Sequence, residues 1–156
     1  MGIYELKFNY NTLIQCDCQM FYKTGIVSAY SQIQPWLIQH CNNIFLTNSF
    51  TLEYGENGRI YDPVRYFESV LTIRRGKLNS ISPIDLKNYI LLCLQFNTYL
   101  IMECKFSNND MIDEQFDECL IYGFDDENDD VIIPLKKNGK WVRKTININD
   151  LILAYH

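Results

Sequence analysis

The chain has 156 residues, a net charge of −5 and a hydrophobic share of 47%. This length suits one domain with a sizeable core, so we expect a single domain over residues 1–156. The acidic balance and the lack of a long basic stretch argue against binding to nucleic acid. No apolar stretch reaches the roughly 20 residues that span a bilayer, and the first residues do not resemble a signal peptide. These features predict a cytoplasmic protein without a membrane partner, whose six cysteines are mostly thiols.

The first half of the chain has mainly helical patterns. Residues 4–14 alternate weakly between apolar and polar, which predicts an edge strand or an extended arm. Apolar residues then recur at close to helical spacing over residues 18–33. Pro35 suits the first turn of a second helix, which is expected to end near Asn42. A short strand over residues 50–54 is expected to follow.

The second half begins with a helix whose start is clearly marked. Ser82 is a capping residue, Pro83 suits the first turn, and an apolar stripe continues to Leu94. The remaining predicted elements are strands over 99–104, 119–124, 131–135 and 141–148, an Asn138-Gly139 hairpin turn, and a closing helix over 150–155 capped by Asn149. This order predicts an α+β domain with N-terminal helices followed by an antiparallel β-sheet.

Short motifs in this sequence resemble a known family. The strand and turn Leu120-Ile121-Tyr122-Gly123-Phe124-Asp125 precedes Val131-Ile132-Ile133 and the stretch from Ile148 to Tyr155. Together with Pro35-Trp36-Leu37-Ile38, this order resembles the papain-like cysteine-peptidase fold, and specifically the N-terminal domain of butirosin biosynthesis protein H. The resemblance implies a place in bacterial biosynthesis of peptides, polyketides or aminoglycosides. The best-known activity of that family is thiol-dependent acyl transfer from a carrier protein to an amine.

The resemblance also assigns catalytic positions, and two of them hold the wrong residue. It places the nucleophile on Cys18, at the start of a helix whose dipole could lower the thiol pKa. It places the histidine base on Asp117 and the orienting acid near Lys136, where no acid stands. The only histidines are His40 and His156. Because an aspartate is a weak base near neutral pH and raises the pKa of a neighbouring thiol, Cys18 is expected to be a vestigial nucleophile.

Three further residues are candidates for a cleft or binding surface. Glu103 and Lys105 lie at the end of a predicted buried strand, and Tyr122 lies on the strand that follows the base position. A strand that simply leaves the core would show the same pattern for the two charged residues, so both interpretations stay open. Arg74-Arg75-Gly76-Lys77 is taken as the one basic cluster, either a solvated turn or a contact for a phosphopantetheine group or an acidic partner.

Metal and cofactor sites are not expected. Cys16, Cys18, His40 and Cys41 include the right ligand types for zinc, but adjacent histidine and cysteine give poor spacing. The acidic run over residues 125–130 lacks the glycine and the final glutamate of a calcium-binding loop. A solvated hairpin turn is the favoured interpretation of that run.

The sequence therefore favours a non-catalytic role over an enzyme. We expect an accessory, scaffold or binding protein that holds a protein partner, such as a biosynthetic enzyme or a carrier protein. An exposed edge strand would also permit self-association. One alternative is a Cys18-dependent acyltransferase or thioester-processing enzyme acting on a carrier-protein-bound substrate, with Asp117, water or a partner's residue as base. The other is a module for a small apolar ligand, suggested by 11 tyrosines and nine phenylalanines.

Overall fold

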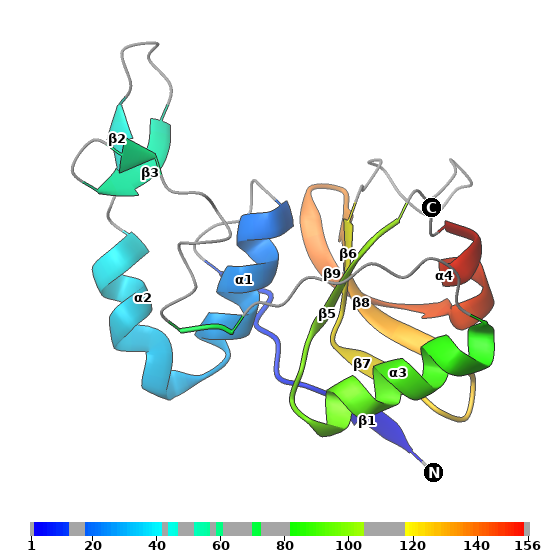
Figure 1. Ribbon diagram of the computed structural model, residues 1–156. Coiled ribbons are helices and arrows are strands. Elements are labelled where there is room, and N and C mark those ends of the chain that lie inside the picture. The colour runs from blue at the N-terminus through cyan, green and yellow to red at the C-terminus, as the bar shows by residue number, and fades with distance from the viewer. Residues whose placement is uncertain are drawn as a thin grey trace. The chain divides into compact units, whose positions relative to one another are not determined.

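The computed structural model describes residues 2–12, 18–41, 44–46, 52–56, 59–60, 70–72, 82–104 and 118–154. The chain divides into two compact units, and each is described by itself. The first unit combines residues 1–10 with residues 77–156, and the second comprises residues 11–76. Each unit contains both helices and antiparallel strands, which confirms the predicted α+β class (Figure 1). The extent of a single domain over the whole chain stays a prediction.

The second unit contains the helices predicted from the first half of the chain. They are α1 (Cys18–Ser28), the short 3-10 helix η1 (Ser31–Ile33) and α2 (Gln34–Cys41). The single helix predicted over residues 18–33 is therefore divided. The N–H groups of Ala29 and Tyr30 bond three residues back, and Tyr30 then adopts an extended conformation with φ −112°, which ends α1. Pro35 lies in the first turn of α2, as predicted.

A small antiparallel sheet with the order β2-β3-β4 follows α2. Its strands are β2 (Ile44–Leu46), β3 (Leu52–Glu56) and β4 (Arg59–Ile60). The strand predicted over residues 50–54 is confirmed in part by β3. The two outer strands were not predicted, because they are short and are defined by their pairing with β3 rather than by an alternating pattern of their own.

The first unit contains a four-stranded antiparallel sheet with the order β1-β7-β8-β9 and a two-stranded ladder of β5 with β6. Its elements are β1 (Ile3–Glu5), α3 (Pro83–Gln95), β5 (Leu100–Glu103), β6 (Glu118–Ile121), β7 (Gly123–Asp125), β8 (Asp130–Lys137), β9 (Lys140–Asn147) and α4 (Ile148–Ala154). The predicted edge strand over residues 4–14 is confirmed only at its start, as β1.

The strand predicted over residues 119–124 is interrupted at Tyr122. The Tyr122 N–H donates to the Ile132 carbonyl at 3.1 Å, and Gly123 is also paired with Ile132 in the register of β7 with β8. Two residues therefore face one residue of β8, which is the arrangement of a β-bulge. The Tyr122 carbonyl accepts from the Leu6 N–H at 2.8 Å. This bulge lets β6 pair with β5 while β7 pairs with β1.

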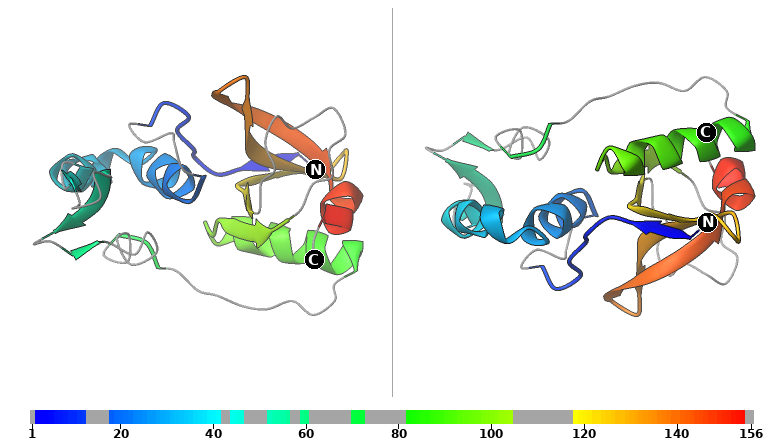
Figure 2. Two further views of the ribbon diagram at one scale, coloured as in Figure 1. Left: turned by 90° about the horizontal axis from the view of Figure 1, so that it is seen from above. Right: turned by 90° about the horizontal axis from the view of Figure 1, so that it is seen from below.

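Two helices cover one face of the four-stranded sheet (Figure 2). α3 turns Leu86, Ile90 and Leu94 inward, and this spacing of four residues is the apolar stripe that the sequence predicted. The buried residues of α4 join the same core. On the sheet, the core is continued by Phe124, Val131 and Ile133.

The ends of the helices and the hairpin turn follow from local chemistry. Ser82 caps α3 as predicted, since its Oγ accepts from the Asp85 N–H at 3.2 Å. The cap predicted for the last helix is wrong: Asn147 Oδ1 accepts from the Asn149 N–H at 3.1 Å, so Asn147 is the capping residue. Asn138 and Gly139 have φ values of 50° and 73°, which confirms the predicted two-residue turn between β8 and β9.

Candidate functional site

Cys18 is the first residue of α1, where the sequence placed the start of a helix. The structure describes its backbone position, while its side chain lies outside the described part. No acidic residue lies in the first turn of α1, and the helix is buried from Phe21 to Val27. The position at a helix start favours the thiolate form of a cysteine, since the exposed N–H groups carry partial positive charge. Whether Cys18 reacts stays a prediction.

Carboxylates lie at the end of the β5–β6 ladder, next to the position that the resemblance gives to the base. Asp117 and Lys105 are outside the described residues. Glu118, which directly follows Asp117, is paired with Glu103 in the register of the two strands. Glu103 is exposed, as expected of a strand that leaves the core. The register therefore places two acidic residues directly opposite each other at this end of the ladder.

The same ladder contains a pair of buried thiols. Cys104 and Cys119 are 2% and 3% exposed and form no disulfide. A hydrogen bond between the two side chains, together with burial, raises the pKa of Cys119 well above its ordinary value. Cys119 is therefore protonated near neutral pH, and both cysteines are free thiols in a buried setting, as predicted.

Tyr122 lies beneath the N-terminal arm, residues 2–10. It is 1% exposed, its hydroxyl is 2.5 Å from that of Tyr10, and its ring stacks on Phe8 with centroids 5.2 Å apart. The arm is held further by the Tyr99 hydroxyl, which donates to the Lys7 carbonyl at 2.5 Å. These aromatic rings fill space against one another. A binding role for Tyr122 stays a prediction, and it would require the arm to move.

Two charged residues hold the arm to the far strand of the sheet. Arg143 on β9 contacts Glu5 on β1, with Nη2 and Oε2 3.1 Å apart. The pair spans β7 and β8, where Gly123 is paired with Glu5 and the Ile132 side chain lies against Gly123. A Cβ at Gly123 would lie 2.8 Å from the Tyr4 carbonyl oxygen, so the close approach of the arm requires glycine.

The tyrosine pair predicts how stability responds to alkaline pH. Burial raises the pKa of both Tyr10 and Tyr122 above the ordinary value near ~10. The unfolded chain therefore releases these protons first, and the stability present below about pH 10 is lost as pH rises toward the folded pKa values. We expect the unfolding midpoint in urea to fall more steeply above pH 10 in the wild type than in the double variant Tyr10→Phe/Tyr122→Phe. Equal slopes would contradict this linkage.

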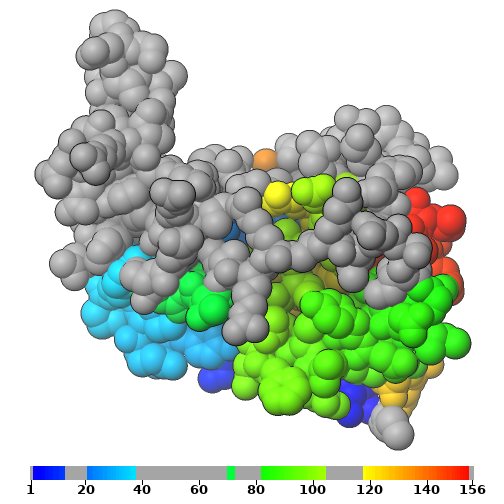
Figure 3. All heavy atoms as spheres, viewed as in Figure 1, coloured from blue at the N-terminus to red at the C-terminus, as the bar shows by residue number. Residues whose placement is uncertain are grey.

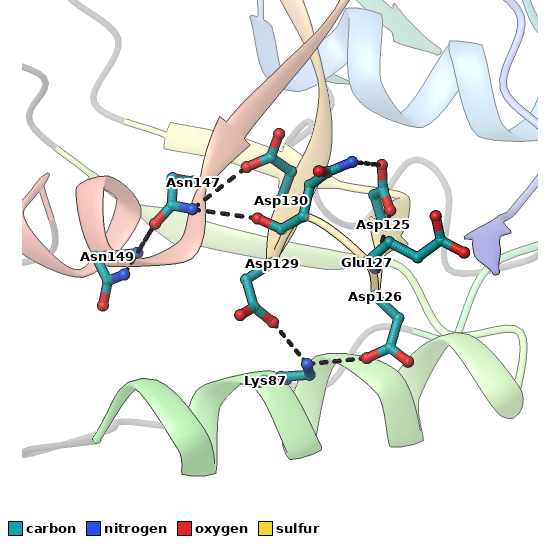
Figure 4. A network of polar contacts seen from close by, with 9 residues as sticks. Lys87, Asp125, Asp126, Glu127, Asp129, Asp130, Asn147 and Asn149 are labelled. Atoms are coloured by element: carbon teal, nitrogen blue, oxygen red, sulfur yellow. Dashed lines mark hydrogen bonds and ion pairs between the residues drawn. The ribbon is translucent and has the colours of Figure 1, made fainter. Parts of the chain in front are cut away.

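The acidic run over residues 125–130 forms the turn between β7 and β8, and it contacts the ammonium group of a lysine on α3 (Figure 4). Lys87 on α3 places its Nζ 2.9 Å from Asp126 Oδ1 and 2.6 Å from Asp129 Oδ1. The same Nζ lies 5.5 Å from the centre of the Phe124 ring. Asn128 donates to Asp125 at 2.8 Å, and this hydrogen bond lowers the pKa of the Asp125 carboxyl. The carboxylates of Asp125, Asp126 and Asp129 are thus paired with side chains of the protein itself.

Removing the charge of Lys87 should destabilise the first unit. Lys87→Met leaves Asp126 and Asp129 facing each other across the turn, and we expect the free energy of unfolding to fall by about 1 kcal/mol at low salt. The loss should shrink at high salt, because both carboxylates are partly exposed and screened. Lys140→Met is the matched control, since Lys140 has no ion pair among the described residues and faces Lys137, so its removal breaks no attraction. Urea unfolding at two salt concentrations measures the difference, and equal losses in the two variants would contradict it.

One surface was missed by the sequence analysis, which took Arg74–Lys77 as the one basic cluster. The β8–β9 hairpin carries Lys136, Lys137, Lys140, Arg143 and Lys144. The signal was available, because no acid occurs between Asp130 and Asp150. The Arg74–Lys77 cluster itself lies outside the described residues.

Other expectations about ligands and partners are tested only in part. Within the described ranges, no three His, Cys, Asp or Glu side chains gather in an arrangement that could hold a metal ion. The absence of metals and cofactors stays a prediction. In the part of the chain that the structure describes, no helix has both the length and the apolar character needed to cross a membrane. Comparisons with protein-family models, with curated proteins and with solved structures gave no match.

Proposed function

We propose that this chain is a catalytically degenerate papain-like domain that serves as an accessory, scaffold or binding protein in bacterial specialised-metabolite biosynthesis. One observation supports the proposal that catalysis has been lost. The strand that would present the base, β6, begins with a carboxylate that is paired with a second carboxylate, Glu118 with Glu103, and continues with the buried thiol Cys119. No imidazole is available on this strand.

Acyl transfer by a cysteine needs a thiolate and a group that carries a proton near neutral pH. Carboxylates supply neither function well, because their ordinary pKa lies near ~4 and their charge raises the pKa of a neighbouring thiol. Cys119 is held protonated by its hydrogen bond with Cys104 and by burial, and the pKa of Tyr122 is raised by burial. The described groups of β6 and of the bulge therefore do not replace the missing base.

A binding role is supported by the outer face of α3. Tyr89, Leu92 and Phe96 lie on one side of the helix and are 44%, 51% and 74% exposed. Figure 3 shows α3 at the visible surface of the first unit. Large exposed apolar side chains in a row are more typical of a contact surface than of a solvated helix. The proposed partner is a biosynthetic enzyme or a carrier protein.

The alternative is an enzyme in which Cys18 still transfers an acyl group. It is supported by the position of Cys18 at the start of α1, with no acid in the first helical turn. In this alternative, Asp117, a water molecule or a residue of another protein acts as base. The two proposals differ in the pKa of one thiol.

The alkylation rate of Cys18 as a function of pH tests the proposal. We expect a rate that rises with an apparent pKa close to the ordinary value near ~8.5, because a helix start alone stabilises the thiolate weakly and β6 presents no imidazolium to add to it. Mass mapping of the alkylated peptides identifies the thiol, and Cys18→Ala removes the signal. Cys93→Ala is the matched control, because Cys93 is a half-buried free thiol on α3. An apparent pKa below about 7 for Cys18 would favour the enzyme.

A further inference from the structure

The β8–β9 hairpin ends in a basic surface. Lys137 and Lys140 are directly opposite each other beside the Asn138-Gly139 turn. Lys144 follows on β9, and because side chains alternate along a strand, Lys140, Val142 and Lys144 share one face with Lys137. We call Lys137, Lys140, Val142 and Lys144 the hairpin face. Figure 2 shows that the tip of the hairpin projects from the sheet on the side away from α3.

The charges of the hairpin face are not balanced within the described structure. Like charges directly opposite each other on a hairpin destabilise it, and Lys137 and Lys140 are such a pair. Among the ion pairs of the described residues, Arg143 is paired with Glu5, and none involves Lys137, Lys140 or Lys144. An anionic occupant would remove this repulsion.

The hairpin face also has an apolar centre. Val142 is 38% exposed and lies between Lys140 and Lys144 on β9. The two-residue turn fixes the ends of both strands, so the lysines are carried by a rigid element rather than by a loop. An apolar side chain that is flanked by cations along its strand fits a partner with carboxylates on both sides of an apolar side chain.

Charge favours an acidic protein over other anionic partners. The chain has a net charge of −5, and the carboxylates of the β7–β8 turn lie at the other end of β8. A long polyanion such as nucleic acid would meet these acids as well as the lysines. Stacking on bases is also disfavoured, because the one tryptophan of the hairpin, Trp141, is only 7% exposed. Lysines on the edge strand β9 oppose strand-to-strand pairing with a second copy.

We propose that the hairpin face is the docking surface for an acidic protein segment that carries apolar side chains. The inference rests on the proposed binding role, and it adds a second surface to the outer face of α3 and names the chemistry of the partner that would dock there. It does not depend on the reactivity of Cys18. If the hairpin face binds the partner while Cys18 accepts acyl groups, this inference holds and the proposed loss of catalysis is wrong. If Cys18 does not react and the hairpin face binds nothing, the proposed loss of catalysis holds and this inference is wrong.

The test is a titration of the full chain with a helical peptide that presents glutamates and leucines on one face. At low salt, we expect saturable shifts of the backbone amide signals of the hairpin face. The triple variant K137E/K140E/K144E should weaken binding about tenfold or more, since each exposed ion pair contributes modestly and reversal adds repulsion. The variant keeps like charges at the facing pair, so its cost in folding resembles that of the wild type. K140Q alone should weaken binding by a smaller factor.

The matched control is R74E/R75E/K77E, which changes the net charge by the same amount at the other basic cluster. It should bind the peptide as tightly as the wild type does. Equal weakening in both triple variants would mean that net charge alone drives binding, and would overturn the inference. Lack of saturable shifts at the hairpin face would overturn it as well. Tighter binding of duplex DNA or of anionic phospholipid vesicles, or self-association abolished by the lysine reversals, would assign the face to a different occupant.

Discussion

Replacing Gly123 with valine is expected to lower the free energy of unfolding by about 3 kcal/mol. A Cβ at this position would lie 2.8 Å from the Tyr4 carbonyl oxygen and 2.9 Å from Ile132 Cδ1. The first contact is with backbone, so it cannot be relieved by a change of rotamer. The arm or the β7–β8 pairing would have to shift, and the Glu5–Arg143 contact that crosses this position would be lost with it.

Gly2→Val is the matched control for this substitution. No atom lies within 4 Å of a Cβ built at Gly2, so valine fits there without contact. Urea unfolding should give a control variant within about 0.5 kcal/mol of the wild type. Gly123→Val should also increase hydrogen exchange at the amide of Leu6, which is bonded to the Tyr122 carbonyl. A Gly123→Val variant as stable as the control would contradict the packing of the arm on β7.

Replacing Tyr122 with alanine is expected to cost about 3–5 kcal/mol. The side chain is 1% exposed, stacks on Phe8 and shares a hydrogen bond with Tyr10. Its removal leaves a cavity beneath the arm, and it leaves the half-buried hydroxyl of Tyr10 without its partner. Tyr122→Phe keeps the ring and should cost only about 1 kcal/mol, the contribution of a neutral hydrogen bond.

A double-mutant cycle separates the hydroxyl contact from the packing. Tyr10→Phe and Tyr122→Phe each remove the same hydrogen bond, so the double variant should be more stable than the sum of the single effects predicts. Tyr4→Phe is the control, since Tyr4 is exposed and, among the described residues, its hydroxyl forms no hydrogen bond with Tyr122. Additive effects at positions 10 and 122 would contradict the hydroxyl pair.

The elements that the sequence predicted well are those defined by nearby residues. α3 has its cap at Ser82, a proline in its first turn and an apolar stripe, and the hairpin has Asn138-Gly139 as its turn. Each of these signals acts over a few residues, so it can be read before the tertiary contacts are known.

The failures arose where distant residues decide the local structure. The bulge at Tyr122 depends on bonds to Leu6 and Ile132, which the pattern of the strand does not contain. The last helix begins at Ile148, where the Ile148 N–H bonds to the Asp129 carbonyl, and this moves the cap from Asn149 to Asn147. Both the bulge and the start of the last helix are therefore determined by pairing with residues that are distant in the sequence.

The candidate site was predictable to a smaller extent. The start of a helix at Cys18 followed from local periodicity, and the sequence alone shows that no histidine lies on β6. The facing carboxylates Glu103 and Glu118 could not be found, because they come together only through the pairing of β5 with β6. The basic hairpin could have been predicted, because the expected Asn138-Gly139 turn already places Lys137 opposite Lys140.

The proposed loss of catalysis is tested most directly by intact-mass measurement after incubation with an acyl-carrier-protein thioester. The wild type, Cys18→Ala and the control Cys93→Ala are compared under the same conditions. We predict that none of the three proteins gains the mass of the acyl group, since β6, the strand that would present the base, carries no histidine. An acyl adduct on the wild type and on Cys93→Ala that is absent from Cys18→Ala would contradict the proposed function and establish Cys18 as a working nucleophile.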